Sequence, residues 1–328
     1  MDKRIFAFVT AAAGLVLLAG PVAATAPEHM QKETSCSVDS MVDNLRESLQ
    51  SGSPSLKRYA STVLREAALT LSAEDLRAAF ARERQPAMVE ALAAALATKA
   101  SHSEDPSLIR PLLSRATHDA DPAVRAAALR GLRSTGSVDM MAKSGERVRY
   151  EQLIQDASPE VRKAVVENLK AESSEVYAGH DRTVSETAIS AAKASTDPAA
   201  TAELLRNASM EQVGSRAVRD VTGQLESSNP QVRAAAASAL GGVQAAHSSE
   251  ARVALTQLYR NDATPEVRRA VLESIARLGQ THAIPALESL ASIDPAMKGE
   301  IDAWIAALKL GLQEWNLISR EKERRETR

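Results

Sequence analysis

The sequence predicts an all-α protein in which about eight helical hairpins stack into an α-solenoid, an α–α superhelix, over residues 39–311. The first observation behind this is a capped helix start at Asp119–Leu132 (DADPAVRAAALRGL), whose imperfect copies recur along nearly the whole chain. The second is composition, because alanine dominates the copies while aromatic residues make up only 3% of the chain. The third is that no segment combines period-two alternation with β-branched or aromatic enrichment, so no strand is expected.

The helix start at Asp121 illustrates the pattern. The Asp121 side chain can accept a hydrogen bond from the free N–H groups of the first turn. Pro122 follows at the first helical position, where its missing N–H costs nothing. Val124 and Leu132 lie two and ten positions after the proline, which places both on one face of a helix.

The same frame recurs along the chain at spacings of 30 to 39 residues. The prolines that mark it are Pro54, Pro86, Pro122, Pro159, Pro198, Pro230, Pro265 and Pro295. Each is preceded by a good capping residue except Pro86, which follows Gln85, and the unit at Pro198 fits the frame least well. Each unit is therefore predicted to pair an outer helix with a proline-capped inner helix. The predicted outer helices are Met41–Leu49, Ala73–Arg84, Leu108–Thr117, Val184–Lys193, Met210–Glu226, Ala251–Tyr259 and His282–Ser289.

The first residues have the pattern of a targeting segment. A short basic start, Lys3 and Arg4, precedes the uncharged and mostly apolar run Ile5–Gly20. Small residues follow, so residues 1–24 are predicted to be a signal peptide that is cleaved after Ala24. The alternative is an uncleaved N-terminal signal anchor, although the run is short for a membrane span. Either form places the repeats outside the cytoplasm, periplasmic or extracellular, and the mature form is predicted to have no membrane span.

Three segments do not fit the repeat pattern. Residues 25–38 are polar and aperiodic, which predicts a linker, and they contain the single cysteine, Cys36. One thiol provides no internal disulfide framework. Residues 134–146 and 172–182 are predicted to be longer hairpin loops.

The C-terminal residues 312–328 are predicted to form a cap and a charged tail. Trp315 and Leu317 are expected to cover the open end of the stack, because the last repeat of a solenoid has no neighbour. Residues 320–328 are then a solvated helix end or a disordered tail.

The turn motif D-x-x-P-x-V-R-x-A occurs at residues 119–127, 156–164 and 262–270, and a copy at Pro230 has Ser227 in place of the aspartate. This pattern resembles the HEAT repeat of the armadillo-type folds, especially the short bacterial HEAT-like type associated with phycobilisome lyases. In such families the aspartate and the arginine form a ladder between adjacent repeats. The resemblance therefore implies a structural ladder of Asp119, Arg125, Asp156, Arg162, Arg233, Asp262 and Arg268. It is expected to stop before both ends, where Lys57 and Lys298 hold the arginine position without an aspartate.

No motif predicts chemistry. The six histidines form no H-x-x-x-H or His-Glu pair, and no C-x-x-C, G-x-S-x-G, Walker or G-x-G-x-x-G pattern occurs. No catalytic residue, metal ligand or cofactor is therefore predicted, and the formal charge of −2 argues against a nucleic-acid partner. The predicted function is an exported, non-enzymatic scaffold or adaptor for protein–protein interaction. The alternative, which the resemblance implies, is a lyase-like enzyme acting on a chromophore-bearing protein; export weighs against it, because those lyases work inside the cell.

The partner surface is predicted on the concave side of the inner helices, at one, four, eight and eleven positions after each proline. In the N-terminal half these positions hold a basic patch for an acidic protein or peptide, with Glu160 and Glu167 among its cations: Arg58, Arg65, Arg130, Arg133, Lys163 and Lys170. The alternative is a solvated charged face. In the sixth and eighth units the same positions hold mainly small residues, which predicts a smooth floor: Gln231, Ala234, Ser238 and Gly241, then Ala296, Gly299, Ala303 and Ala306.

Overall fold

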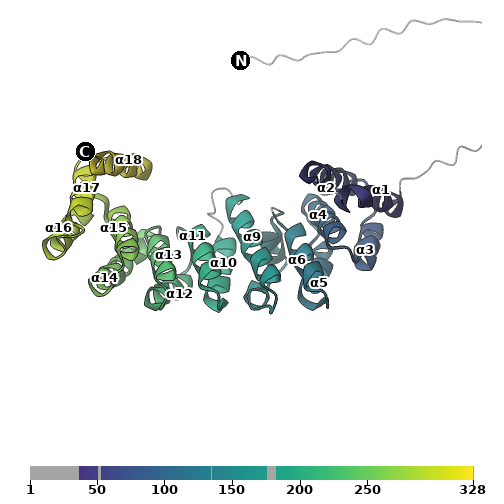
Figure 1. Ribbon diagram of the computed structural model, residues 1–328, viewed down its shortest axis with the longest axis horizontal. Coiled ribbons are helices and arrows are strands. Elements are labelled where there is room, and N and C mark those ends of the chain that lie inside the picture. The colour runs from purple at the N-terminus through teal and green to yellow at the C-terminus, as the bar shows by residue number, and fades with distance from the viewer. Residues whose placement is uncertain (1–36, 51–52, 134, 176–181, 328) are drawn as a thin grey trace, which may run out of the picture. The chain divides into compact units, whose positions relative to one another are not determined.

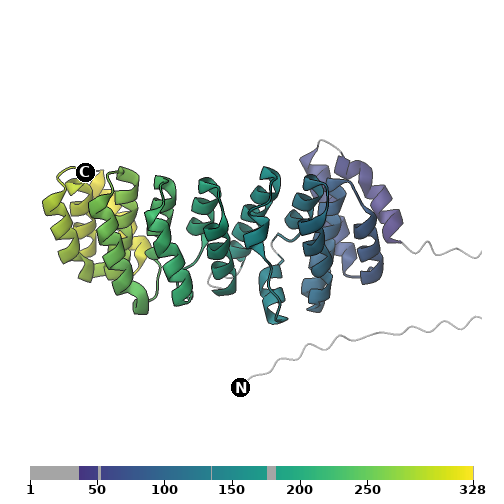
Figure 2. The same cartoon turned by 90° about the horizontal axis from the view of Figure 1, so that it is seen from below.

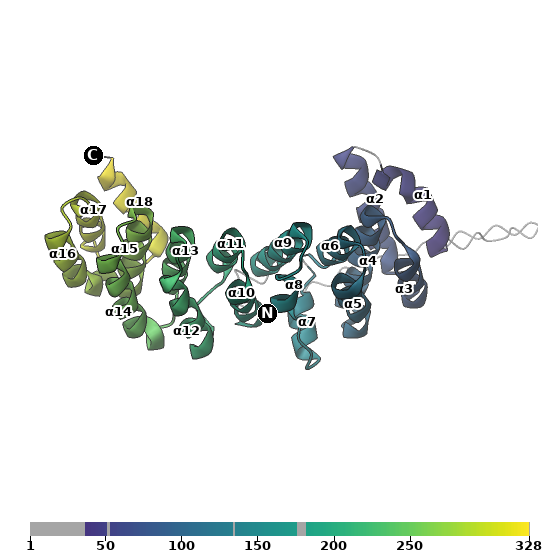
Figure 3. The same cartoon turned by 60° about the horizontal axis from the view of Figure 1, so that its bottom comes forward.

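The computed structural model describes residues 37–50, 53–133, 135–175 and 182–327 (Figures 1, 2 and 3). Within those residues all regular secondary structure is helical and no strand occurs, which confirms the predicted all-α class. The helices belong to one compact unit, residues 36–328. The predicted signal segment 1–24, and the predicted linker except for its last two residues, lie outside the described residues.

The helices alternate along the chain between two rows, and Figures 1 and 3 show α5, α10 and α12 on one side of the stack with α6, α11 and α13 on the other. The outer helices are α1 (Val38–Gln50), α3 (Ala73–Arg82), α5 (Arg110–His118), α7 (Ser137–Lys143), α8 (Tyr150–Leu153), α10 (Arg182–Ala194), α12 (Ser215–Gly223), α14 (Ala245–Asn261) and α16 (Ile284–Ile293). The inner helices are α2 (Pro54–Ala68), α4 (Pro86–Ser103), α6 (Pro122–Gly131), α9 (Pro159–Glu175), α11 (Pro198–Asn207), α13 (Pro230–Leu240), α15 (Pro265–Gly279) and α17 (Lys298–Leu308). From α2 to α15, each inner helix packs against the inner helix of the next unit, as a solenoid requires.

Short 3₁₀ helices complete several turns between units. They are η1 (Pro106–Leu108), η3 (Gln224–Glu226) and η4 (Gln280–Ala283). A further helix, α18 (Trp315–Glu326), follows the last unit.

From α2 to α15 the inner helices begin at the predicted proline. The side chains of Asp121 and Asn229 each accept a hydrogen bond from the backbone N–H two residues on, and proline occupies the next position. Thr264 makes no such capping bond; its own N–H donates to the Asp262 carboxylate instead.

The core runs along the inner helices and repeats with them. Tenth after the proline, the side chains of Leu64, Leu96, Leu132, Leu169, Leu240, Ile275 and Ile305 are all buried. Small residues bring neighbouring helices close together: a Cβ atom added to Gly131 on α6 would lie 2.3 Å from the Cβ atom of Ala93 on α4. The first unit departs from the pattern, because Leu56 is 46% exposed where no earlier repeat covers it.

Three sequence-based boundaries were wrong. Most of the predicted loop 134–146 is helix α7, an outer helix too short and too closely flanked by glycine to show a period. Residues 172–175 continue α9, while residues 176–181 lie outside the described residues. In the last unit the helix begins at Lys298 rather than Pro295, because Asp294 forms a turn that binds the Met297 N–H.

Helix α18 covers the end of the stack. Trp315 stacks on Trp304 of α17 with ring centroids 5.4 Å apart, and Ile318 is fully buried. Lys322 lies over the Trp304 ring and within 3.4 Å of the Glu300 carboxylate. The segment predicted as a solvated tail is therefore largely an ordered helix. Of the described helices, none is long and apolar enough to span a membrane.

Candidate functional site

The turn aspartates organise the junctions between repeats. The Asp156 carboxylate accepts the N–H of Ser158 in its own turn at 2.8 Å and receives two hydrogen bonds from Arg125 of the preceding repeat, at 2.9 and 2.8 Å. A third N–H of Arg125 donates to the carbonyl oxygen of Asp119 at 2.8 Å. The Arg125 hydrogen bonds lower the pKa of the Asp156 carboxyl below its ordinary value, against the effect of burial. The guanidinium thus joins two successive turns.

The same arrangement recurs in the C-terminal half. Arg233 donates to the Asp262 carboxylate at 2.6 Å and to the carbonyl oxygen of Ser227 at 2.8 Å. Arg268 donates to the carbonyl oxygen of Asp262 and reaches the carboxylate of Asp294 at 3.0 Å. The contacts therefore extend to the last unit, through an aspartate next to Pro295 and not at the motif position.

Toward the N-terminus, two arginines from outer helices bind the turn carboxylates in place of the motif arginine. Arg115 of α5 binds the Asp119 carboxylate at 2.9 Å and donates to the carbonyl oxygens of Phe80 and Glu83 in the preceding turn. Arg46 of α1 binds the Glu83 carboxylate at 3.0 Å. Sequence reasoning missed both, because they lie outside the motif; the available signal was that Val89 occupies the arginine position of the second unit.

The contacts are interrupted around the fifth unit. Arg162 donates to the carbonyl oxygens of Asp156 and Ala157, but no carboxylate among the described residues lies within ion-pair distance of it. The next turn offers Ser195 at the aspartate position, and Thr201 replaces the following arginine. The Thr201 hydroxyl donates only within its own unit. The ladder is thus divided into an N-terminal and a C-terminal run.

On the exposed side of the inner helices, four of the six candidate partner-binding cations are paired. Arg130 lies between Glu90 and Glu160, at 2.9 and 3.3 Å, and Arg133 lies 3.7 Å from Glu90. Lys163 and Lys170 also face carboxylates, at 3.8 Å from Glu167 and 2.6 Å from Glu203 respectively. These side chains form an alternating row of opposite charges from α4 to α11. Arg58 and Arg65 of α2 are exposed, and no described carboxylate lies within ion-pair distance of either.

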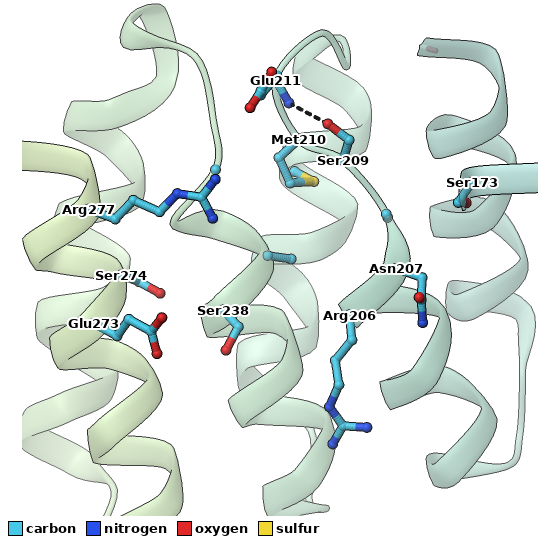
Figure 4. Close-up of a pocket in the computed structure, with 13 residues that line it drawn as sticks. Ser173, Arg206, Asn207, Ser209, Met210, Glu211, Ser238, Glu273, Ser274 and Arg277 are labelled. Atoms are coloured by element: carbon cyan, nitrogen blue, oxygen red, sulfur yellow. Dashed lines mark hydrogen bonds between the residues drawn. The ribbon is translucent and has the colours of Figure 1, made fainter. Parts of the chain in front are cut away.

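A groove of about 480 Å³ crosses the inner helices C-terminal to this row (Figure 4). Its walls come from the end of α11, the segment that follows it, α13 and α15. Side chains that line it include Ser173, Arg206, Asn207, Ser209, Met210, Glu211, Ser238, Glu273, Ser274 and Arg277.

The floor of the groove is built from small residues. Ser274 of α15 donates to the carbonyl oxygen of Ala237 at 2.8 Å, and a Cβ atom added to Gly241 would meet the Ser274 Oγ at 2.8 Å. Ser238 is exposed one turn earlier on α13. The predicted smooth floor of the sixth unit therefore lies in the groove at Ser238, while Gly241 lies beneath it in the contact between α13 and α15.

Two arginines at the groove have weak or no ionic partners. Arg277 has no carboxylate within ion-pair distance among the described residues, and its guanidinium lies beside Gly242. Arg206 is 3.8 Å from Glu203, a carboxylate that Lys170 binds more closely. A guanidinium group that lacks a close carboxylate partner can bind a carboxylate of a ligand. No cluster of His, Cys, Asp or Glu side chains able to hold a metal ion occurs among the residues that the structure describes.

Comparison with known proteins agrees with this architecture. Residues 218–308 match the family model for HEAT repeats. Among solved structures, the chain is similar to a crystal structure of an engineered protein, with 16% sequence identity over 87% of this chain and 98% of that one and a TM-score of 0.29. No curated protein sequence matches the chain. The match to HEAT repeats thus covers residues 218–308, and helix pairs continue through the rest of the described chain.

Proposed function

We propose that this protein is an exported, non-enzymatic scaffold that binds an extended, carboxylate-bearing segment of a partner protein in the groove between α11 and α15. HEAT repeats generally mediate protein–protein interactions, and repeats of this kind present extended surfaces on their inner helices. The observation that carries the proposal is Arg277, which has no carboxylate within ion-pair distance among the described residues, beside an open groove whose other arginine, Arg206, lies 3.8 Å from Glu203.

The contrast with the rest of the inner face supports this position. Between α4 and α11 each cation of the charged row lies within 4 Å of at least one glutamate, so a ligand would have to displace an existing ion pair there. At the groove a ligand carboxylate would meet guanidinium groups that lose little on binding it. The small residues of the floor allow a peptide backbone to approach closely.

Export is supported by the succession of basic, apolar and small residues in residues 1–24. Under this proposal the scaffold works in the periplasm or outside the cell, and its mature chain begins at Thr25. Sequencing the N-terminus of the protein recovered from the envelope separates this form from a retained signal anchor, which would keep Met1.

Site-specific photo-crosslinking in cells tests the binding site. A photoreactive phenylalanine analogue at Ser238, on the groove floor, should form a covalent adduct with one partner protein. The same group at Val253, which is 67% exposed on outer helix α14, should not form that adduct. Equal adducts from both positions, or none from Ser238, would refute the groove as the binding site.

A further inference from the structure

Helix α2, the first inner helix, carries basic side chains that are not paired with a described carboxylate, unlike those on the exposed side of α6 and α9. Arg58 and Arg65 lie seven residues apart on its exposed side, and Lys57 is exposed next to Arg58. No carboxylate of the described residues lies within ion-pair distance of any of the three, although Glu66 is exposed on the same helix. Lys163 and Lys170 hold the corresponding positions of α9, and both are paired.

The same helix exposes large apolar side chains. Leu56 is 46% exposed, Tyr59 is 62% exposed, and Leu69, directly after the last turn of the helix, is 45% exposed. These are three of the seven large hydrophobic side chains that are exposed in the described part of the chain. At about 100° per residue, Arg58, Tyr59, Arg65 and Leu69 fall within about 120° of one another around the helix axis, so these apolar and cationic side chains share one surface, with Lys57 beside it.

We propose that this surface, formed by Arg58, Tyr59, Arg65 and Leu69 with Lys57 beside it, binds the anionic headgroup layer of a lipid membrane. Unpaired arginine and lysine side chains are attracted to anionic lipids, while tyrosine and leucine enter the boundary between headgroups and acyl chains. The surface thus combines the two interactions that hold a protein at a membrane without spanning it.

The position of α2 in the chain agrees with a lipid partner. The helix pair α1–α2 is the first part of the stack after the apolar run Ile5–Gly20, and residues 21–36 separate that run from it. A fully extended linker of this length reaches roughly 55 Å. If the run stays in the bilayer, α2 remains within reach of the lipid surface; if the run is removed, the α2 surface alone supplies the binding. The inference does not depend on the groove between α11 and α15.

The number of basic residues replaced determines how far partitioning onto anionic vesicles should fall. Each basic residue close to an anionic surface raises partitioning by about fivefold. Replacing Lys57, Arg58 and Arg65 by glutamine should therefore lower partitioning by about 100-fold.

The test uses the protein from Thr25 onward, which retains every described helix and lacks the apolar run. Sedimentation with vesicles of neutral phosphatidylcholine is compared with sedimentation with phosphatidylcholine mixed with anionic phosphatidylglycerol. The protein should bind only the anionic vesicles, and Lys57→Gln/Arg58→Gln/Arg65→Gln should lose that binding with an unchanged melting curve. Tyr59→Ser/Leu69→Ser should weaken it while leaving its dependence on anionic lipid intact.

The matched control is Lys163→Gln/Lys170→Gln/Arg269→Gln, which removes the same charge from paired, exposed positions of the inner face. It should bind anionic vesicles within a fewfold of the unmodified protein. Equal binding to neutral vesicles, no binding to either kind, or an equal loss in the control variant would overturn the proposal. Binding of an acidic protein through α2 without any vesicle binding would overturn it as well.

Discussion

Arg125 and Asp156 form a two-bond ion pair across the junction of two repeats, and both side chains are only 14% exposed. The pair matters because each partner is also bound to backbone. Asp156 accepts the Ser158 N–H that closes its turn, and Arg125 donates to the carbonyl oxygen of Asp119. One ion pair therefore fixes two turns and the spacing between their helices.

Replacing Asp156 by alanine should destabilise the protein by roughly 2–3 kcal/mol, because it removes charge-assisted hydrogen bonds and leaves a half-buried guanidinium without its carboxylate. Thermal or urea unfolding followed by circular dichroism measures the loss. Glu167→Ala is the control, since Glu167 makes only a 3.8 Å contact with an exposed lysine and should cost less than about 1 kcal/mol. Equal effects of the two substitutions would show that the turn pairs add no stability.

The turn carboxylates should make the protein sensitive to acid. The pKa of Asp156 is lowered by Arg125, and that of Asp262 is lowered by Arg233 and the Thr264 N–H even though burial raises it. A carboxyl whose folded-state pKa is depressed contributes stability above its unfolded pKa of about 3.9 and loses it as the pH falls. The free energy of unfolding should therefore be flat from pH 8 to 6 and fall below about pH 5. In Asp156→Asn the fall should be shallower; an unchanged slope would assign the acid sensitivity to other groups.

The close approach of α4 and α6 predicts a contrast between two glycines. Gly131→Ala should be destabilising, because the new Cβ atom would lie 2.3 Å from the Ala93 Cβ atom and 2.8 Å from the Glu90 carbonyl oxygen. Gly299→Ala, where nothing lies within 4 Å, should be neutral or stabilising by up to about 1 kcal/mol. Melting temperatures that move in the same direction in both variants would contradict this packing.

The two tryptophans of the sequence, Trp304 on α17 and Trp315 on α18, stack at the C-terminal end, so tryptophan fluorescence reports on that end alone. Trp315→Ala should expose Trp304, shift its emission to longer wavelength and loosen α18 before the other repeats unfold. Leu317→Ala removes a side chain that is 43% exposed on the same helix and should leave the emission unchanged. An unshifted spectrum in Trp315→Ala would mean that α18 does not shield Trp304 in solution.

The repeat architecture could be predicted because its signals are local. A cap residue, a proline and a periodic apolar face lie within one helix, so Asp121, Pro122 and Leu132 carry the information together. The same reasoning failed at α7, whose seven residues are too few to display a period, and in part at α18, where Trp315 covers the end of the stack as predicted but Ile318 is buried in place of Leu317.

The site could be predicted only in part, because it depends on pairing between helices 30 to 40 residues apart. Glu160 and Glu167 were predicted among the cations of the basic patch, but nothing in the sequence near Arg130 indicates that Glu90 will also lie beside it. Arg277 was missed for the opposite reason: it lies twelve residues after its proline, beyond the positions assigned to the groove.

The most direct test of the proposed function compares two double charge reversals for their effect on the adduct formed through Ser238. Arg206→Glu/Arg277→Glu removes the two cations of the groove, whereas Lys163→Glu/Lys170→Glu reverses two cations that already have carboxylate partners. Loss of charged hydrogen bonds in the groove should reduce the adduct about 10- to 100-fold, and the control should stay within a fewfold of the unmodified protein. An undiminished adduct in Arg206→Glu/Arg277→Glu, or an equal loss in the control, would contradict binding in the groove between α11 and α15.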